Sequence, residues 1–391
     1  MLVQLLAIPI ITKNYGLPIF GEVALCSSVG LLLANLVNYG TTQTAVKEVS
    51  IFRNDKNKLS FIFSEIFFLR LTIFFILLFI FPVILLLTRH GKYLIWVSIL
   101  PLLISEIFNP LYFLIGIEKI HWISLSNLFA RALSLVFIFY IQLNNHQTIV
   151  LNLFLSTPQM VYSFLLFYYI LRKYHIKFHI SSFNSIKNKL IENFYVTFNG
   201  STVIMQQTIF MFFVANFASP QSTGSYAIID KFLGAVRQIV SSFSSAIYPK
   251  AAQLYHIGLF EWKMFRSKIQ ILYFLFFLFV GVFILTFAEH AQTYFSQDAN
   301  SMTNIYLKLF SFAPLALALN ANNILDLLLS KSYRDMFVIS VIVLIFTIIT
   351  SILIAKNINE SYIGLYPLII ESACLIIYTT FLRFKRPHYF V

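Results

Sequence analysis

Long apolar runs alternate with short polar segments along nearly the whole chain. A helix that crosses the hydrocarbon core of a bilayer needs about 20 mostly apolar residues. Residues 1–12 form a shorter apolar segment, which we interpret as the end of a shortened first span. The remaining windows of this kind are 20–45, 60–88, 93–115, 120–143, 149–171, 193–217, 224–249, 268–288, 304–330, 334–355 and 361–382. The pattern predicts an all-α polytopic membrane protein with about twelve transmembrane helices.

The basic residues of the polar segments are distributed unevenly between the two predicted sides of the membrane. When alternate loops are grouped, one set holds about nineteen Lys and Arg residues and the other about four. Cytoplasmic loops carry the excess of basic residues in membrane proteins. We therefore predict that the richer set, which includes the C-terminus, is cytoplasmic.

The longest polar loop, from Arg172 to about Glu192, separates two sets of about six predicted spans. This loop predicts an N-terminal six-helix lobe over 1–180 and a C-terminal six-helix lobe over 181–391. Two such lobes would lie around a central cavity.

Two glycines suggest a repeat. Gly21 opens the second predicted span and Gly224 opens the eighth, and Lys47 and Lys250 follow them at equal distances. A parallel repeat about an axis along the membrane normal explains this spacing, and so does coincidence.

The composition excludes a soluble globular protein. Of 391 residues, 59% are hydrophobic and 11% are charged, and the mean hydropathy is +0.81. The formal net charge of +13 is explained by cytoplasmic loops, so nucleic acid is not a predicted partner. Cys26 and Cys374 lie in apolar stretches and are interpreted as small buried hydrophobic residues.

The sequence contains no GxxxxGK, HExxH or CxxC motif, so it predicts no ATP-driven motor, no metal centre and no cofactor. The predicted outer loops, such as 144–147 and 219–222, are only a few residues long. An active site for a soluble substrate would need a longer segment outside the membrane. We therefore do not expect an enzyme.

Charged residues inside the spans are the main functional candidates. A central arginine costs about 2.5–3.5 kcal/mol to insert, so one without a role should be replaced readily. Arg131 and Arg237 lie nearest to the centres of their spans. Each either binds substrate or forms a structural pair with a buried acid such as Glu106 or Glu371. The basic residues within spans are Arg70, Arg131, Lys231, Arg237 and Lys308.

Polar residues also recur at helical spacing within three spans. The stripe in the eighth span should face a wet cavity or another helix, because lipid would leave its polar groups unsatisfied. Polar contacts between helices are the alternative explanation. The tenth span adds Pro314 as an expected kink. The stripes are Asp230, Gly234, Arg237, Ser241, Ser244 and Tyr248; Ser28, Asn35, Asn38 and Thr42; and Asn322, Asp326 and Ser330.

A cavity lined by arginines and hydroxyl groups suits an anionic substrate, because a guanidinium group offers several donors to phosphate oxygens. Asp230 and Asp326 are candidates for carrying a coupling ion. The predicted substrate-binding residues are Arg237, Arg131, Arg70, Lys231, Ser241 and Asn38.

Several segments resemble the Wzx-type O-antigen and polysaccharide-repeat flippases. The first cytoplasmic loop region of that family is similar to IPIITKNYGLPIFGEVAL followed by NYGTTQTAVKEVSIFRNDKNKLS. The junction of its fourth and fifth spans resembles NPLYFLIGIEKIHWIS, and its eighth span resembles GSYAIIDKF with AIYPKAAQLY. The resemblance implies the fold of the multidrug/oligosaccharidyl-lipid/polysaccharide exporter superfamily, with two bundles around a central cavity.

The resemblance also implies a substrate and a location. The substrate would be an undecaprenyl-pyrophosphate-linked oligosaccharide, turned from the inner to the outer leaflet of the bacterial inner membrane by alternating access. Expected partners are this lipid-linked oligosaccharide and membrane lipid, with a polysaccharide polymerase and a chain-length regulator as further candidates. A drug exporter of the same superfamily, a polysaccharide polymerase, a membrane glycosyltransferase and a scaffold are the alternatives.

Overall fold

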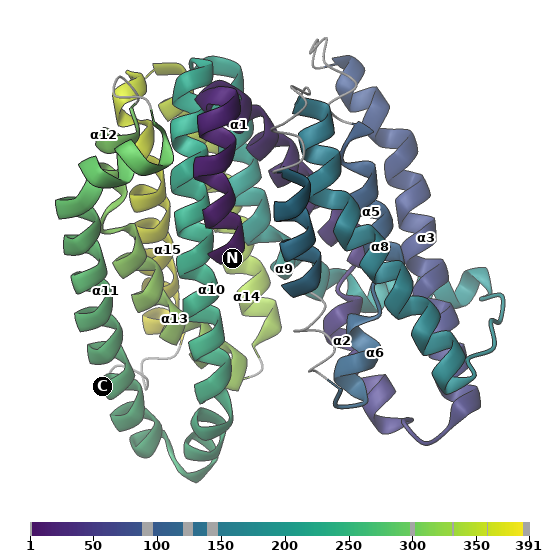
Figure 1. Ribbon diagram of the computed structural model, residues 1–391. Coiled ribbons are helices and arrows are strands. Elements are labelled where there is room, and N and C mark those ends of the chain that lie inside the picture. Colours follow the sequence, from purple (N-terminus) through teal and green to yellow (C-terminus); the bar gives the residue numbers. More distant parts are fainter. Residues whose placement is uncertain are drawn as a thin grey trace. The chain divides into compact units, whose positions relative to one another are not determined.

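The computed structural model describes residues 2–87, 97–119, 128–138, 148–297, 302–330, 332–357 and 359–385 (Figure 1). All regular structure in these ranges is helical, as predicted. Seven of the described helices are long and apolar enough to cross a membrane. Parts of the predicted spans 93–115 and 120–143, and Arg386 of the C-terminal tail, lie outside the described residues.

The first helices follow the predicted windows. Helix α1 (Leu2–Asn38) contains both the short first segment and the second span, separated by Gly16 at φ 82° and ψ 164°. A positive φ of this kind is readily adopted only by glycine. The next continuous helices are α2 (Thr41–Ile51), α3 (Lys56–Leu87), α8 (Thr148–Tyr174) and α9 (Phe183–Phe217). A shorter apolar helix covers Leu128–Ile138.

Three predicted spans are broken rather than continuous. The fourth consists of α5 (Leu100–Ile107) and α6 (Leu111–Gly116). The tenth consists of α12 (Thr303–Phe310) and α13 (Ala313–Leu329), and Pro314 lies in the first turn of α13, so the expected kink lies at a two-residue turn between the two helices. The last begins as a 3₁₀ helix, η1 (Glu360–Leu365), and continues as α15 (Tyr366–Lys385).

Two helices extend beyond their apolar windows. Helix α10 (Pro220–Ile257) and helix α11 (Leu259–Phe295) are separated only by Gly258, so the loop expected between residues 249 and 268 is almost entirely helical. Polar residues can continue a helix outside the hydrocarbon, where side chains and water satisfy its ends. The correction matters because it places Arg266 on a helix rather than in a loop. Helix α14 (Tyr333–Asn357) follows the eleventh window closely.

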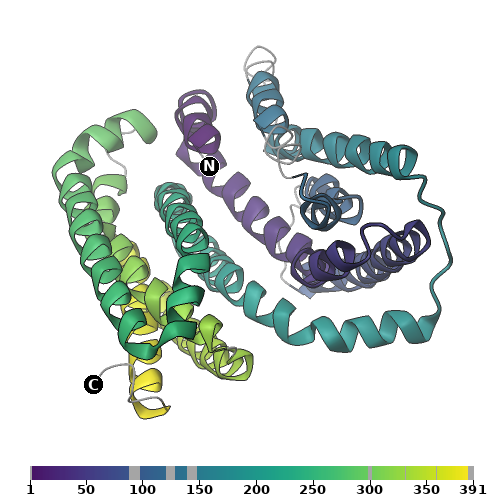
Figure 2. The same cartoon turned by 90° about the horizontal axis from the view of Figure 1, so that it is seen from below.

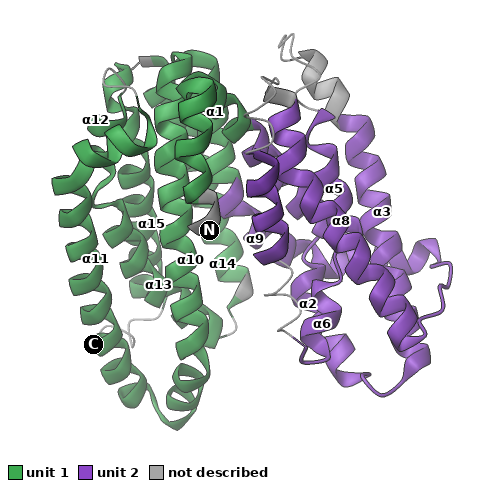
Figure 3. Ribbon diagram, in the orientation of Figure 1, with its two compact units in different colours: residues 1–25, 205–391 green, residues 26–204 purple. Residues whose placement is uncertain are grey.

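The chain divides into two compact units (Figure 3). Unit 1 contains residues 1–25 and 205–391, and unit 2 contains residues 26–204. The division differs from the one predicted between residues 180 and 181, because α1 and α9 each contribute to both units. The interpretation of the lobes as six-helix halves stays a prediction.

Within unit 1, α10, α11, α13 and α15 lie side by side (Figures 1 and 2). One side of α11 is strongly apolar and exposed: its exposed large residues include Phe274, Leu275, Phe279, Phe283 and Phe287. An exposed apolar surface of this size suits contact with lipid. Cys26 and Cys374 are buried and unlinked, as expected.

Candidate functional site

Arg237 forms an ion pair with Glu371 inside unit 1. Its Nη2 donates a hydrogen bond to Oε1 of Glu371, and the two side chains are 18% and 8% exposed. The other terminal nitrogen, Nη1, is buried and has no hydrogen-bond partner among the described residues. This is the pairing that the sequence left open as the alternative to substrate binding. A role for Arg237 in binding substrate stays a prediction.

The start of α10 is tied to the element that precedes α15. Ser219 caps α10 by accepting a hydrogen bond from the Ser222 backbone, and Pro220 follows at the first helical position. Glu360 of η1 accepts hydrogen bonds from the Ser219 backbone at 2.9 Å and from the Ser219 hydroxyl at 2.7 Å. These bonds link the element that carries Arg237 to the segment that leads to Glu371.

Helix α10 changes environment along its length. Residues 222–230 are all buried, whereas Ser241 and Tyr248 are exposed and Lys231 is half-buried. Ser244 shares a 3.1 Å hydrogen bond with Tyr273 of α11. The polar stripe therefore passes from the interior of unit 1 to an exposed surface, and Arg237 lies at the transition.

Asp230 lies seven residues before Arg237 on this stripe, about 10 Å away along the helix axis. Its side chain is 8% exposed, and Oδ1 is buried with no hydrogen-bond partner among the described residues. A buried carboxylate oxygen without a donor is costly as an anion. Of the two candidate ion carriers, Asp230 and Asp326, Asp230 is therefore the one whose carboxylate can accept a further hydrogen bond or a proton.

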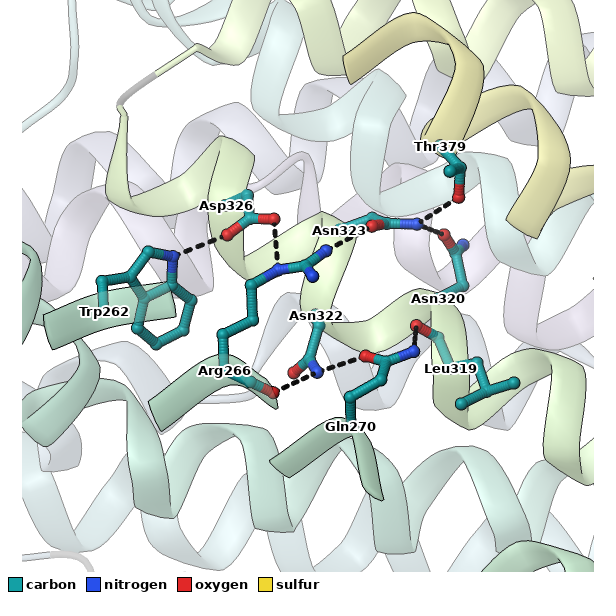
Figure 4. Close-up of polar contacts among 9 residues, drawn as sticks. All are labelled: Trp262, Arg266, Gln270, Leu319, Asn320, Asn322, Asn323, Asp326 and Thr379. Atoms are coloured by element: carbon teal, nitrogen blue, oxygen red, sulfur yellow. Dashed lines mark hydrogen bonds and ion pairs between the residues drawn. The ribbon is translucent and has the colours of Figure 1, made fainter. Parts of the chain in front are cut away.

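Asp326 is instead held by two donors (Figure 4). It is completely buried on α13, and it accepts a 2.8 Å hydrogen bond from Trp262 Nε1 and a 2.9 Å bond from Arg266 Nε. Arg266 also donates to Asn323 at 2.9 Å, and Asn323 donates to Thr379 of α15 at 3.0 Å. This network joins α11, α13 and α15. The sequence does not predict this network, because Arg266 lies outside the apolar windows 224–249 and 268–288.

Arg70 is fully enclosed in unit 2, with 1% of its surface exposed. Its Nη1 donates to the backbone carbonyls of Glu106 at 2.9 Å and Asn109 at 2.6 Å, and Nε and Nη2 donate to Thr41 Oγ1 at 2.9 and 2.7 Å. The two carbonyls lie at the break between α5 and α6, where Pro110 supplies no N–H group. Arg70 thus donates to the Asn109 carbonyl and adds a shorter bond to the Glu106 carbonyl, which also accepts a 3.4 Å bond from the Asn109 backbone N–H.

Asn38 also contacts this break. Its amide donates to Glu106 Oε2 at 3.1 Å and to Thr42 Oγ1 at 2.7 Å. Asn109 donates to the same carboxylate at 3.2 Å. Glu106 therefore accepts hydrogen bonds from amides within unit 2.

The remaining candidate, Arg131, is half-buried on the helix Leu128–Ile138 in unit 2. The predicted site residues belong to both compact units. Unit 1 contains Arg237, Lys231, Ser241, Asp230 and Asp326, and unit 2 contains Arg131, Arg70 and Asn38.

Solved structures with similar folds are transporters. The inward-facing conformation of a multidrug resistance MATE family transporter of the MOP superfamily matches with a TM-score of 0.77 and 14% identity, over 98% of each chain. The inward closed conformation of the lipid II flippase MurJ matches with a TM-score of 0.73 and 14% identity, over 98% of this chain and 85% of that one. These matches confirm the predicted fold class.

Sequence comparison gives the family. A protein of Escherichia coli (strain K12) named "Putative O-antigen transporter" is 22% identical over 253 residues, which cover 64% of this chain and 60% of that relative. The match thus spans less than two thirds of the relative's length. The family model described as "Polysaccharide biosynthesis protein" matches residues 1–255. Because this match covers more than half of the chain and agrees with the resemblance to polysaccharide-repeat flippases, the chain belongs to this family of multi-pass membrane proteins.

Proposed function

We propose that this protein is a flippase for a lipid-linked oligosaccharide. It moves an undecaprenyl-pyrophosphate-linked repeat unit from the inner to the outer leaflet of the bacterial inner membrane by alternating access. The proposal is supported by the family match, by the relative named as an O-antigen transporter and by the fold shared with a lipid II flippase. Lipid and the oligosaccharide are its partners, and a polymerase and a chain-length regulator would act on the exported product. We propose no enzymatic activity and a cytoplasmic C-terminus.

The observation that carries the proposal is the state of Arg237. A guanidinium group has five N–H donors, and a carboxylate can engage two of them side by side. Here Glu371 engages Nη2, while Nη1 is buried and finds no hydrogen-bond partner in the described part of the chain. The arginine therefore keeps donor capacity for a second anion, which suits the pyrophosphate of a lipid-linked sugar.

The proposed binding residues differ in their freedom to contact substrate. Lys231 and Ser241 of unit 1 and Arg131 of unit 2 are half-buried or exposed, and we propose that each of them binds substrate. Arg70 and Asn38 are occupied at the break between α5 and α6, so we assign them a structural role. We propose Asp230 as the ion carrier in preference to Asp326, because no described residue donates a hydrogen bond to its Oδ1.

Deletion of the gene tests the proposal. We expect loss of surface polysaccharide and accumulation of lipid-linked repeats in the inner leaflet, both restored by the intact gene. Single repeats that reach the outer leaflet without being joined would instead indicate a polymerase. Normal polysaccharide together with increased sensitivity to cationic drugs would indicate a drug exporter.

A further inference from the structure

The ion pair between Arg237 and Glu371 raises a question that the proposed function leaves open. A buried arginine in a membrane binds an anion strongly, and a transporter must also release its substrate. In the structure Nη2 of Arg237 already donates a hydrogen bond to the Glu371 carboxylate, so an anion that binds Nη2 must compete with Glu371. Breaking a buried pair leaves an uncompensated charge unless that charge is neutralised.

We propose that Glu371 is a built-in competitor for the anion-binding site of Arg237. Resting on the proposed function, the inference is that a pyrophosphate group that first contacts Nη1 then displaces Glu371 from Nη2 of the guanidinium. The freed carboxylate takes up one proton from water and becomes a neutral acid. When Glu371 loses this proton and returns to Arg237, it expels the anion and resets the site.

The surroundings of Glu371 favour neutralisation over a second ion pair. Among the described residues, the titratable groups that interact electrostatically with the pair are Tyr226 and Asp230 of α10 and Tyr366 and Cys374 of α15. None of these four side chains is a cation at neutral pH, and Asp230 is itself a carboxylic acid. A released Glu371 carboxylate therefore finds no replacement for Arg237 among them. With 8% of its side chain exposed, it is also poorly hydrated, so uptake of a proton is the accessible route.

The pair is held in a well-packed frame, so displacement involves side chains rather than unfolding. The ring of Tyr366, one turn before Glu371, stacks on Phe210 of α9 with an interplanar angle of 1°. Its hydroxyl donates to the backbone carbonyl of Gln206 at 3.1 Å. These contacts fix the start of α15, and Arg237 has room to respond because its side chain is 18% exposed.

By linkage, the anion and the proton must favour each other's binding. Removing the competitor with Glu371→Gln should strengthen binding of an anion to Arg237 and abolish the accompanying proton uptake. The same variant should transport more slowly, because the anion is no longer expelled.

The test measures binding of inorganic pyrophosphate to the intact protein in lipid nanodiscs by calorimetry at constant salt. Repeating it in two buffers with different ionisation enthalpies counts the protons taken up. We expect uptake of about one proton by the wild type, none by Glu371→Gln, and an affinity about tenfold higher for the variant, which corresponds to about 1.4 kcal/mol. Glu371→Asp, which keeps the charge but has a shorter reach, should give an intermediate affinity and retain proton uptake.

The matched control is Glu289→Gln. Glu289 pairs with Lys308 in the same unit at 3.2 Å but is 73% exposed, so its loss should change neither affinity nor proton count. Equal affinity and equal proton uptake in wild type and Glu371→Gln would overturn the inference while leaving the flippase proposal intact. Absence of pyrophosphate binding in both proteins would overturn it as well. The deletion phenotype decides the proposed function independently.

Discussion

Gly21 of α1 and Gly224 of α10 touch each other across a helix crossing. A Cβ atom built on Gly21 would lie 2.8 Å from the backbone nitrogen of Gly224, and one built on Gly224 would lie 2.2 Å from the carbonyl oxygen of Leu17. Such distances are far below van der Waals contact, so both positions require glycine. These are the two residues that correspond in the suspected repeat, which itself stays a prediction.

Gly224→Ala should therefore separate α1 from α10. The added methyl group would meet backbone atoms, which cannot rotate away, and overpacking of this kind costs about 1–3 kcal/mol or more. We expect lower membrane abundance and a lower thermal unfolding temperature in detergent. The control is Gly200→Ala on α9, where a Cβ meets nothing within 4 Å. That change should be neutral or stabilising by up to about 1 kcal/mol.

Because Arg237 pairs with Glu371, its substitution should affect both transport and protein abundance. Arg237→Ala should stop transport, and it should also lower abundance, because an unpaired buried Glu371 costs about 3–5 kcal/mol. The double variant Arg237→Gln with Glu371→Gln removes both charges and should restore abundance but not surface polysaccharide. Arg237→Lys should restore some transport by keeping the charge without the fork of donors.

Surface polysaccharide should be measured beside membrane protein level in each of these strains. Lys308→Gln serves as the control, because its ion pair with Glu289 is exposed. Normal polysaccharide in the double variant would remove Arg237 from the transport mechanism and leave it a purely structural residue.

Arg70→Ala should act on stability. It removes a donor from each of two backbone carbonyls at the break between α5 and α6. The Glu106 carbonyl keeps a 3.4 Å bond from the Asn109 N–H, and loss of the donor to the Asn109 carbonyl costs about 1–3 kcal/mol. We expect a clear fall in abundance, with normal polysaccharide export per molecule that remains. Arg172→Ala, which alters an exposed arginine, should leave abundance unchanged. If Arg70→Ala had normal abundance but no transport, Arg70 would instead be a substrate-binding residue.

The Arg266–Asp326 pair should behave as a structural unit. Asp326→Asn and Arg266→Gln should each lower the unfolding temperature, and the double variant should lose less than the sum of the two, because the residues are in direct contact. The coupling is measured by a double-mutant cycle of thermal unfolding. If Asp326→Asn were fully stable yet unable to transport, Asp326 would be the ion carrier instead.

The topology can be tested with alkaline phosphatase fusions. Fusions placed after His179, between α8 and α9, and after Lys385 should be inactive, because the basic residues around them are predicted to hold both sites in the cytoplasm. A fusion after Ser219, between α9 and α10, should be active. The opposite pattern would invert the predicted orientation.

The sequence by itself determined the class of protein and its family. Runs of about 20 apolar residues are a local property, and a chain with 11% charged residues has no other way to cover its surface than with lipid. Helical periodicity also identified the stripe on α10 and the central position of Arg237. Both conclusions hold without knowledge of which helices are neighbours.

Only the tertiary structure decided what each buried charge contacts. Arg237 and Glu371 are 134 residues apart, and Arg266 and Asp326 are 60 apart. Arg70 contacts the carbonyls of Glu106 and Asn109, which lie where the predicted fourth span is interrupted before Pro110. Periodicity fixes the face of a helix on which a side chain lies, but not the rotation and height of the helix packed against it. Those two variables select the partner, and they depend on side-chain packing throughout the unit.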